Sequence, residues 1–200
     1  MSAFAETGID AVSIRAVNRA AGAGPAAVHY HFGTKESLLT AVLQHHGDAV
    51  VQAIIERSTA LLQRDHASPA EVVHSIAQPY VDLLRTEGIS GLQWVKVVDQ
   101  LLRRDPDSVD DRRASEIRRR VTGMAFPNAD SAAIERAMST SVQLFVSQVA
   151  RLRPVDVADP VSLDAVSADL EFLADFLAGG LQETLQTAAL RGSGPDLTLT

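Results

Sequence analysis

The sequence predicts an all-α protein, and three of its features favour helices over strands. Hydrophobic residues make up 46% of the chain but aromatic residues only 4%, and Ala, Leu, Val, Glu and Arg dominate, which argues against a sandwich or barrel. Residues that form turns divide the chain into segments of helical length. Within several of these segments, apolar residues recur every three or four positions, as on one face of a helix.

Composition also restricts the class of protein. A chain of 200 residues can form one mid-sized domain or a small domain joined to a larger one. It has no cysteine, which excludes disulfides, zinc-thiolate sites and thiol nucleophiles. We expect a cytoplasmic protein without membrane contact, because no apolar run approaches the roughly 18 residues of a membrane span and the N-terminus lacks a signal-peptide pattern.

Two short helices are expected near the N-terminus. Ser13 can cap a helix and Gly22 can end one, so the first is expected over residues 13–22. Pro25 suits the first position of a helix because its missing N–H costs nothing there, and the second helix is expected from Pro25 to about His31. Gly24 lies between them, so the two helices are joined by a tight turn.

Longer helices are expected over the rest of the chain. Thr34 can cap a helix that Lys35 begins and that runs to about Leu62. The turn-forming residues predict further helices near 69–86, 89–104, 106–122, 130–152 and 162–190. The last of these carries an apolar stripe of Leu163, Val166, Leu170, Leu173, Leu177 and Leu181.

The N-terminal pattern is typical of a DNA-binding domain. Two short helices joined by a glycine-containing turn, followed by a basic residue at the next helix start, are the parts of a helix-turn-helix. The stretch SIRAVNRAAGAGPAAVHYHFGTKESLLTAVL resembles the DNA-binding domain of the TetR family of bacterial transcriptional regulators. The net charge of −7 describes the whole surface, so it does not exclude a small DNA-binding domain joined to a larger acidic domain.

The resemblance implies a domain organisation and a function. Residues 1–47 would form the helix-turn-helix domain, 48–191 a helical domain for effector binding and dimerisation, and 192–200 a flexible tail. The implied function is a ligand-responsive regulator without enzymatic activity, a repressor that a small-molecule effector releases from a palindromic operator in double-stranded DNA. Two copies would pair through the helices near 130–152 and 162–190. The residues do not distinguish repression from activation, and no cofactor or metal is expected.

The resemblance also places the residues that face DNA. They are Ser13, Ile14, Arg15, Pro25, Ala26, Ala27, His29, Tyr30, His31 and Lys35. Arg15 and Lys35 would bind phosphates. The two alanines could contact thymine methyl groups, and Tyr30 and His31 could donate hydrogen bonds to a phosphate or a base edge. Val28 and Phe32 alternate with these residues and are expected in the core of the domain.

The N-terminal segment departs from the family in two respects. The family's first helix usually begins about a dozen residues earlier. Three explanations are open: the start of the sequence is placed too late, the chain is truncated, or the domain is unusually small. Basic and acidic residues over 1–47 balance (Arg15, Arg19 and Lys35 against Glu6, Asp10 and Glu36). We therefore expect phosphate affinity to be weaker and less dependent on salt than that of a basic reader.

An effector pocket is expected between the C-terminal helices, where a bundle would place one. The candidate lining residues are His74, Gln78, Tyr80, Gln93, Trp94, Met124 and Phe126. The apolar members of this set could equally be ordinary core. The C-terminal helices are apolar and poor in aromatic residues, and this composition favours a hydrophobic effector.

Several segments allow two interpretations. DPDSVDD, residues 105–111, could bind a metal ion, but Asp105 followed by Pro106 is more typical of a helix start. RRASEIRRR, residues 112–120, could be a second nucleic-acid patch or the solvated late part of a helix. Gly179 and Gly180 weaken the last helix, which a close helix crossing at a dimer seam would offset. A helical dimeric sensor that does not bind DNA selectively is the alternative function.

Overall fold

The computed structural model describes residues 1–24, 26–105 and 111–192, with side chains described as far as residue 189. Over these residues all regular structure is helical, as the composition predicts. The helices are α1 (Ser2–Thr7), α2 (Ile14–Ala20), α3 (Ala27–Phe32), α4 (Lys35–Leu62), α5 (Pro69–Arg104), α6 (Arg112–Ala125), α7 (Ser131–Ala150), α8 (Pro154–Ala158) and α9 (Pro160–Gly192). None of these helices combines the length and the apolar character needed to cross a membrane.

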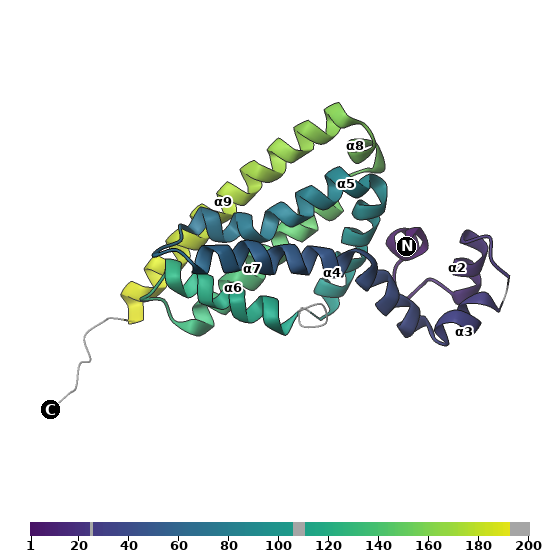
Figure 1. Ribbon diagram of the computed structural model, residues 1–200, viewed down its shortest axis with the longest axis horizontal. Coiled ribbons are helices and arrows are strands. Elements are labelled where there is room, and N and C mark those ends of the chain that lie inside the picture. The colour runs from purple at the N-terminus through teal and green to yellow at the C-terminus, as the bar shows by residue number, and fades with distance from the viewer. Residues whose placement is uncertain (25, 106–110, 193–200) are drawn as a thin grey trace.

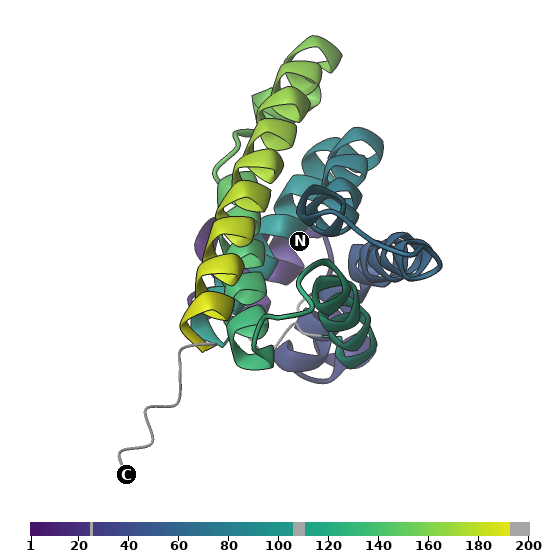
Figure 2. The same cartoon turned by 90° about the vertical axis from the view of Figure 1, so that its left-hand side faces the viewer.

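The helices form two groups along the long axis of the molecule (Figure 1). The short helices α1, α2 and α3 lie together at one end, beside the first turns of α4. Helices α5, α6, α7 and α9 form a bundle that the rest of α4 joins. The long helix α4 therefore belongs to both groups, and the expected domain boundary at residues 47 and 48 falls inside it. Helix α9 lies at the edge of the bundle (Figure 2).

Local capping explains where the helices of the first group begin. The Ser13 hydroxyl accepts a hydrogen bond from the Ala16 N–H at 3.2 Å, and the Thr34 hydroxyl accepts one from the Ser37 N–H at 3.1 Å. Each bond satisfies one N–H that the first helical turn leaves without a partner. These two starts confirm the sequence prediction, and α4 runs from Lys35 to Leu62 as expected.

Helix α5 spans two of the expected helices and is bent. The expected break at Glu87 and Gly88 is present, but the chain continues in the helix on both sides of it. Gly88 has φ 51° and ψ −122°, a conformation that a residue with a Cβ atom rarely adopts. The helical stretches on either side of this kink confirm the two expected helices, 69–86 and 89–104, which together make up α5.

Three predictions need correction. Of the helix expected over 106–122, the described part is α6, with Asp111 as its cap, and Asp105 is the C-cap of α5. Residues 106–110, and with them most of the DPDSVDD segment, lie outside the described residues. The basic run 112–120 begins α6 and is not the late part of a helix. Helix α8 was not expected, and the expected tail beyond residue 192 lies outside the described residues.

Two hydrophobic cores organise the molecule, and α5 contributes to both. The larger core joins residues of α4, α5, α6, α7, α8 and α9. The smaller core lies under α1, α2 and α3 and includes Phe4, Val12 and Val28. Val97 of α5 is part of the smaller core, while its neighbours Val95 and Val98 are part of the larger one.

A polar clamp holds the N-terminal group on α5. The Gln100 side chain accepts a hydrogen bond from the Ile9 N–H at 2.9 Å and donates one to the Phe4 carbonyl at 3.1 Å. Close by, Arg104 forms an exposed salt bridge with Asp10 at 2.8 Å. Because Ile9 is buried, its N–H depends on Gln100 for a partner, and a lost partner is costly in a buried position. The Phe4 carbonyl also accepts a hydrogen bond from the Gly8 N–H at 3.1 Å.

The clamp gives a first testable prediction. The substitution Gln100→Ala leaves the buried Ile9 N–H without its partner, while the Phe4 carbonyl keeps the Gly8 N–H, so it should lower the free energy of unfolding of the N-terminal group by about 1–3 kcal/mol. Hydrogen exchange should show faster exchange over residues 1–12. Gln93→Ala is the control, because Gln93 is half-buried on the same helix and its side chain bonds no described residue. Equal protection of residues 1–12 in both variants would contradict the prediction.

Candidate functional site

The turn between α2 and α3 has the geometry of a helix-turn-helix. Gly22 follows the end of α2 with φ 63°. Its N–H donates to the Arg19 carbonyl at 3.1 Å, and the Ala23 N–H donates to the Asn18 carbonyl at 2.8 Å. This pair of bonds is a Schellman motif, which requires a left-handed residue at the Gly22 position. The turn therefore ends α2 and directs the chain into α3.

A buried hydrogen bond fixes the angle between the two helices. Asn18 is 2% exposed, and its side-chain oxygen accepts a hydrogen bond from the Val28 N–H at 3.1 Å. Val28 is itself buried against Phe4, Ile9, Val12 and Leu38. The side chain of α2 thus supplies the partner that a first-turn N–H of α3 lacks within its own helix.

The outer face of α3 is exposed and polar. Tyr30 is 84% exposed, and His29, His31 and Ala26 are also exposed. The Tyr30 and His31 rings contact each other edge to face, with centroids 5.1 Å apart. Phe32 is exposed as well, at 38%, so its expected place in the core is wrong. Val28 alone on this helix is buried, because a helix of two turns presents only one narrow face to the core.

Two of the expected DNA-facing side chains are held by the protein itself. The Lys35 ammonium donates a hydrogen bond to the Asp10 carbonyl at 3.1 Å. His29 Nδ1 donates to the Gly33 carbonyl at 2.9 Å and so satisfies a carbonyl at the end of α3. Lys35 keeps two further N–H groups, and His29 keeps Nε2. Both side chains can still reach a phosphate or base while they support the local fold.

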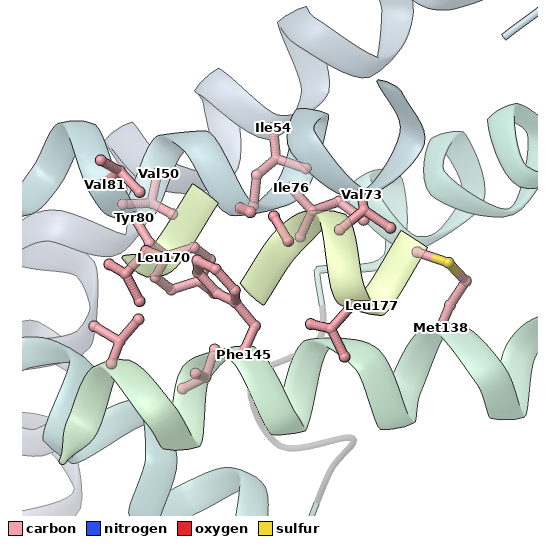
Figure 3. Close-up of a cluster of buried hydrophobic side chains, with 14 of the residues drawn as sticks. Val50, Ile54, Val73, Ile76, Tyr80, Val81, Met138, Phe145, Leu170 and Leu177 are labelled. Atoms are coloured by element: carbon pink, nitrogen blue, oxygen red, sulfur yellow. The ribbon is translucent and has the colours of Figure 1, made fainter. Parts of the chain in front are cut away.

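The bundle contains a cavity of about 650 Å³. Helices α4, α5, α6 and α7 supply its walls. Its apolar lining includes Val50, Ile54, Tyr80, Trp94, Val98, Leu102, Ile134 and Met138. Figure 3 shows Tyr80, Val50, Ile54 and Met138 within the cluster of buried side chains. A volume of this size is in the range of sites for small organic ligands.

Tyr80 is an aromatic residue of the cavity wall that also carries a hydroxyl group. Its ring packs against Trp94 and Phe145, with centroids 6.2 and 6.0 Å away. Burial raises the pKa of Tyr80 to about 12, and the positive charge of Arg118 acts in the opposite direction. The hydroxyl is therefore protonated at neutral pH. The Trp94 N–H is satisfied by the Leu43 carbonyl at 2.8 Å.

A family profile matches the N-terminal group of helices. Residues 1–42 match the profile described as bacterial regulatory proteins, tetR family. The N-terminal helices therefore form a domain of the kind found in bacterial regulatory proteins of the tetR family.

Comparison with solved structures found similar chains. One is the TetR family transcriptional regulator PfmR from Thermus thermophilus, with 18% sequence identity and a TM-score of 0.45. The match covers 86% of this chain and 92% of that chain. Comparison with curated proteins found no match.

The structure brings together the described residues that the sequence predicts to face DNA. Ser13, Ile14 and Arg15 begin α2, and Lys35 begins α4 beside α3. Arg15 and Ser13 are exposed, while Ile14, Ala27 and Lys35 are half-buried. Pro25 lies outside the described residues.

The expected pocket residues divide into two sets. Tyr80 and Trp94 line the cavity. His74 instead pairs with Asp175 at 2.9 Å, and Gln78 donates to Asp82 at 3.0 Å. Gln93, Met124 and Phe126 are not among the residues that line the cavity either.

Sequence reasoning missed three functional positions. Asn18 was not singled out, although a polar residue near the end of a short helix before a turn is a candidate for such a bond. Gln100 gave no local signal, because its partners are more than 90 positions away. Arg118 was assigned to a solvated face, but it lies one turn after buried Ala114 and one turn before buried Thr122. Within the described residues, no group of three His, Asp or Glu side chains could hold a metal ion.

The bond between α2 and α3 gives a second prediction. Asn18→Ala leaves the Val28 N–H buried without its partner, which should destabilise the helix-turn-helix by about 1–3 kcal/mol and weaken DNA binding. The exchange rate of the Val28 amide, measured by NMR, should rise. The control is Arg19→Ala, which changes an exposed neighbour on the same helix. The role given to Asn18 fails if the Val28 amide stays as protected as in the control.

Proposed function

We propose that this chain is a TetR family repressor that a small-molecule effector releases from a palindromic operator. The observation that carries the proposal is the double role of α5 between residues 94 and 104. Trp94, Val98 and Leu102 line the cavity, while Val97 and Gln100 contact the helix-turn-helix group. A ligand that shifts α5 would therefore shift the DNA-binding helices with it.

The proposed domain organisation follows from these contacts. Residues 1–47 would read DNA, residues 48–191 would bind the effector and dimerise, and residues 192–200 would form a tail. Helix α4 joins the two domains without a break. The effector can change operator occupancy only through its different affinities for the DNA-bound and released conformations.

At the operator, α3 would lie in the major groove. Ala26 and Ala27 are small enough to let the helix approach thymine methyl groups, and Pro25 precedes them in the sequence. Tyr30 and His31 project into solvent, where they could donate to a base edge or phosphate. Ser13, Ile14 and Arg15 at the start of α2, with His29 and Lys35, would hold the backbone on either side.

We also propose that two copies pair through α7 and α9. Helix α9 carries an exposed apolar face with Phe172 at 74% and Phe176 at 68% exposure, and Leu144 of α7 is 49% exposed. Gly179 and Gly180 continue this face of α9, and a Cβ atom at either would meet nothing within 4 Å. Apolar side chains beside two glycines suit the close approach of the same helix from a second copy.

The DNA-binding proposal predicts a selectable operator. Duplexes selected from a randomised library by the purified chain should share a palindrome with half-sites about one helical turn apart. That operator, placed across a promoter, should reduce transcription in vitro when the protein is added. No enrichment of any sequence would favour a sensor that does not bind DNA selectively, and increased transcription would overturn the repressor assignment.

The Arg15→Gln variant separates phosphate contact from sequence readout. Because Arg15 would bind a phosphate, its loss should weaken affinity for all duplexes and reduce the slope of log K against log salt by about one per protomer. Arg136→Gln, an exposed charge on α7, is the control.

The dimer proposal predicts that Phe176→Asp gives monomers. A carboxylate in the centre of an apolar interface should cost about 2 kcal/mol or more per protomer, and light scattering after gel filtration should show the mass halved. The control is Tyr30→Asp, which changes an exposed aromatic residue on α3. A dimer that survives both Phe172→Asp and Phe176→Asp would place the interface elsewhere.

A further inference from the structure

Two neutral polar side chains on α7 line the cavity. Ser139 and Gln143 are half-buried, and neither side chain bonds a described residue. The neighbouring Ser141, in contrast, donates a hydrogen bond to the Ala137 carbonyl at 2.9 Å, within its own helix. The hydroxyl of Ser139 and the amide of Gln143 therefore remain available to a molecule in the cavity.

The spacing of Ser139 and Gln143 lets both side chains reach one group of a ligand. Residues four positions apart on a helix are neighbours on the same side, with about 5–6 Å between their Cβ atoms. The hydroxyl can donate one hydrogen bond and the amide two. No buried side-chain nitrogen or oxygen among the described residues lacks a hydrogen-bond partner, so the free polar atoms of both residues are accessible. A ligand can therefore take the place of water on them.

Several other polar groups of the cavity wall already have partners. The Trp94 N–H donates to the Leu43 carbonyl at 2.8 Å, so the indole presents only apolar ring atoms to a ligand. The Ser115 hydroxyl accepts a hydrogen bond from Arg118 at 2.8 Å. Ser139 and Gln143 are therefore well placed to recognise a polar group of a ligand.

The charged residues of the wall do not favour a charged ligand. Five of them are exposed, carry both signs and are screened by water: Asp48, Arg112, Glu116, Arg119 and Glu135. Asp111 is engaged as the cap of α6. Arg118 is half-buried, but its guanidinium already has interactions within the protein. A charged ligand would lose hydration among the apolar walls and would find no free charge of opposite sign among the described residues there.

We infer that the effector is an uncharged, mainly apolar compound whose hydrogen-bond acceptor, such as a carbonyl oxygen, binds Ser139 and Gln143. The inference rests on the proposed function of the cavity and narrows its ligand class. The apolar body would pack against Val50, Ile54 and Met138, which α4 and α7 place on the cavity wall. An analogue without the acceptor would leave the two side chains unpaired, so they would give the site its selectivity.

The fluorophore Prodan tests the hydrogen bonds. It is an uncharged naphthalene with a carbonyl group, and in its propyl analogue a methylene replaces that carbonyl. Ser139→Ala and Gln143→Leu should each weaken Prodan binding to the full-length protein by about two- to tenfold, the contribution of a neutral hydrogen bond. Binding of the propyl analogue should not weaken. Thr140→Ala and Gln148→Leu remove a hydroxyl and an amide from exposed positions of α7 and are the matched controls.

A second pair of probes tests the charge, and a variant with a smaller cavity tests the location. N-phenylnaphthylamine is uncharged and should bind more tightly than anilinonaphthalene sulfonate, which adds a sulfonate to the same apolar body. Val51→Phe narrows the cavity and should weaken the binding of Prodan, its propyl analogue and N-phenylnaphthylamine alike. Circular dichroism checks that each variant folds.

The outcomes distinguish the inference from the function on which it rests. Unchanged Prodan binding in both Ser139→Ala and Gln143→Leu, or an equal loss for the propyl analogue, would overturn the hydrogen-bond assignment and leave the cavity as the effector site. Equal or tighter binding of the sulfonate would overturn the uncharged class. Failure of every uncharged probe to bind, or binding that Val51→Phe does not weaken, would overturn both the inference and the effector site. The comparison of the charged and uncharged probes needs no variant, so it stands even where a variant does not fold.

Discussion

The attachment of the N-terminal helices to α5 determines how the rest of the molecule can work. Gln100 supplies partners for two buried backbone groups of residues 4 and 9, and Val97 enters the smaller core. One or two positions away, Val98 and Leu102 line the cavity. Opposite faces of the same helical turns therefore contact the DNA-binding domain and the proposed effector. Because well-packed contacts of this kind resist continuous deformation, movement of α5 is expected to carry the attached helices as a unit.

The parts of the fold that sequence predicts are those set by neighbouring residues. Ser13 and Thr34 start helices because their partners lie three positions away, and Gly22 ends α2 through bonds within five positions. The same reasoning located the break at Gly88, where a non-helical residue separates two helical stretches of α5. A local signal marks a change of direction, whereas the tertiary contacts decide whether the helix resumes.

The functional positions that sequence missed depend on which helices face each other. Sequence reasoning assigned Arg118 to a solvated face with its neighbouring arginines, whereas it lies four positions from both buried Ala114 and buried Thr122, on the same side of α6. The exposed face of α9 was open to prediction, because Phe172 and Phe176 lie four positions apart and out of phase with the stripe of Leu170, Leu173 and Leu177. Apolar residues on two faces of one helix indicate a second partner.

The charge of the DNA-binding domain makes the proposed dimer necessary for tight binding. Basic and acidic residues over 1–47 balance, and Lys35 and His29 each donate a hydrogen bond within the domain. One half-site should therefore be bound weakly, since phosphate contacts supply much of the affinity for DNA. Two linked domains can bind tightly only when their spacing matches both half-sites, because the second contact is then intramolecular. A small shift of α5 that changes this spacing removes the affinity that the dimer gains by binding both half-sites at once. Because each half-site alone is bound weakly, operator binding then depends strongly on the effector.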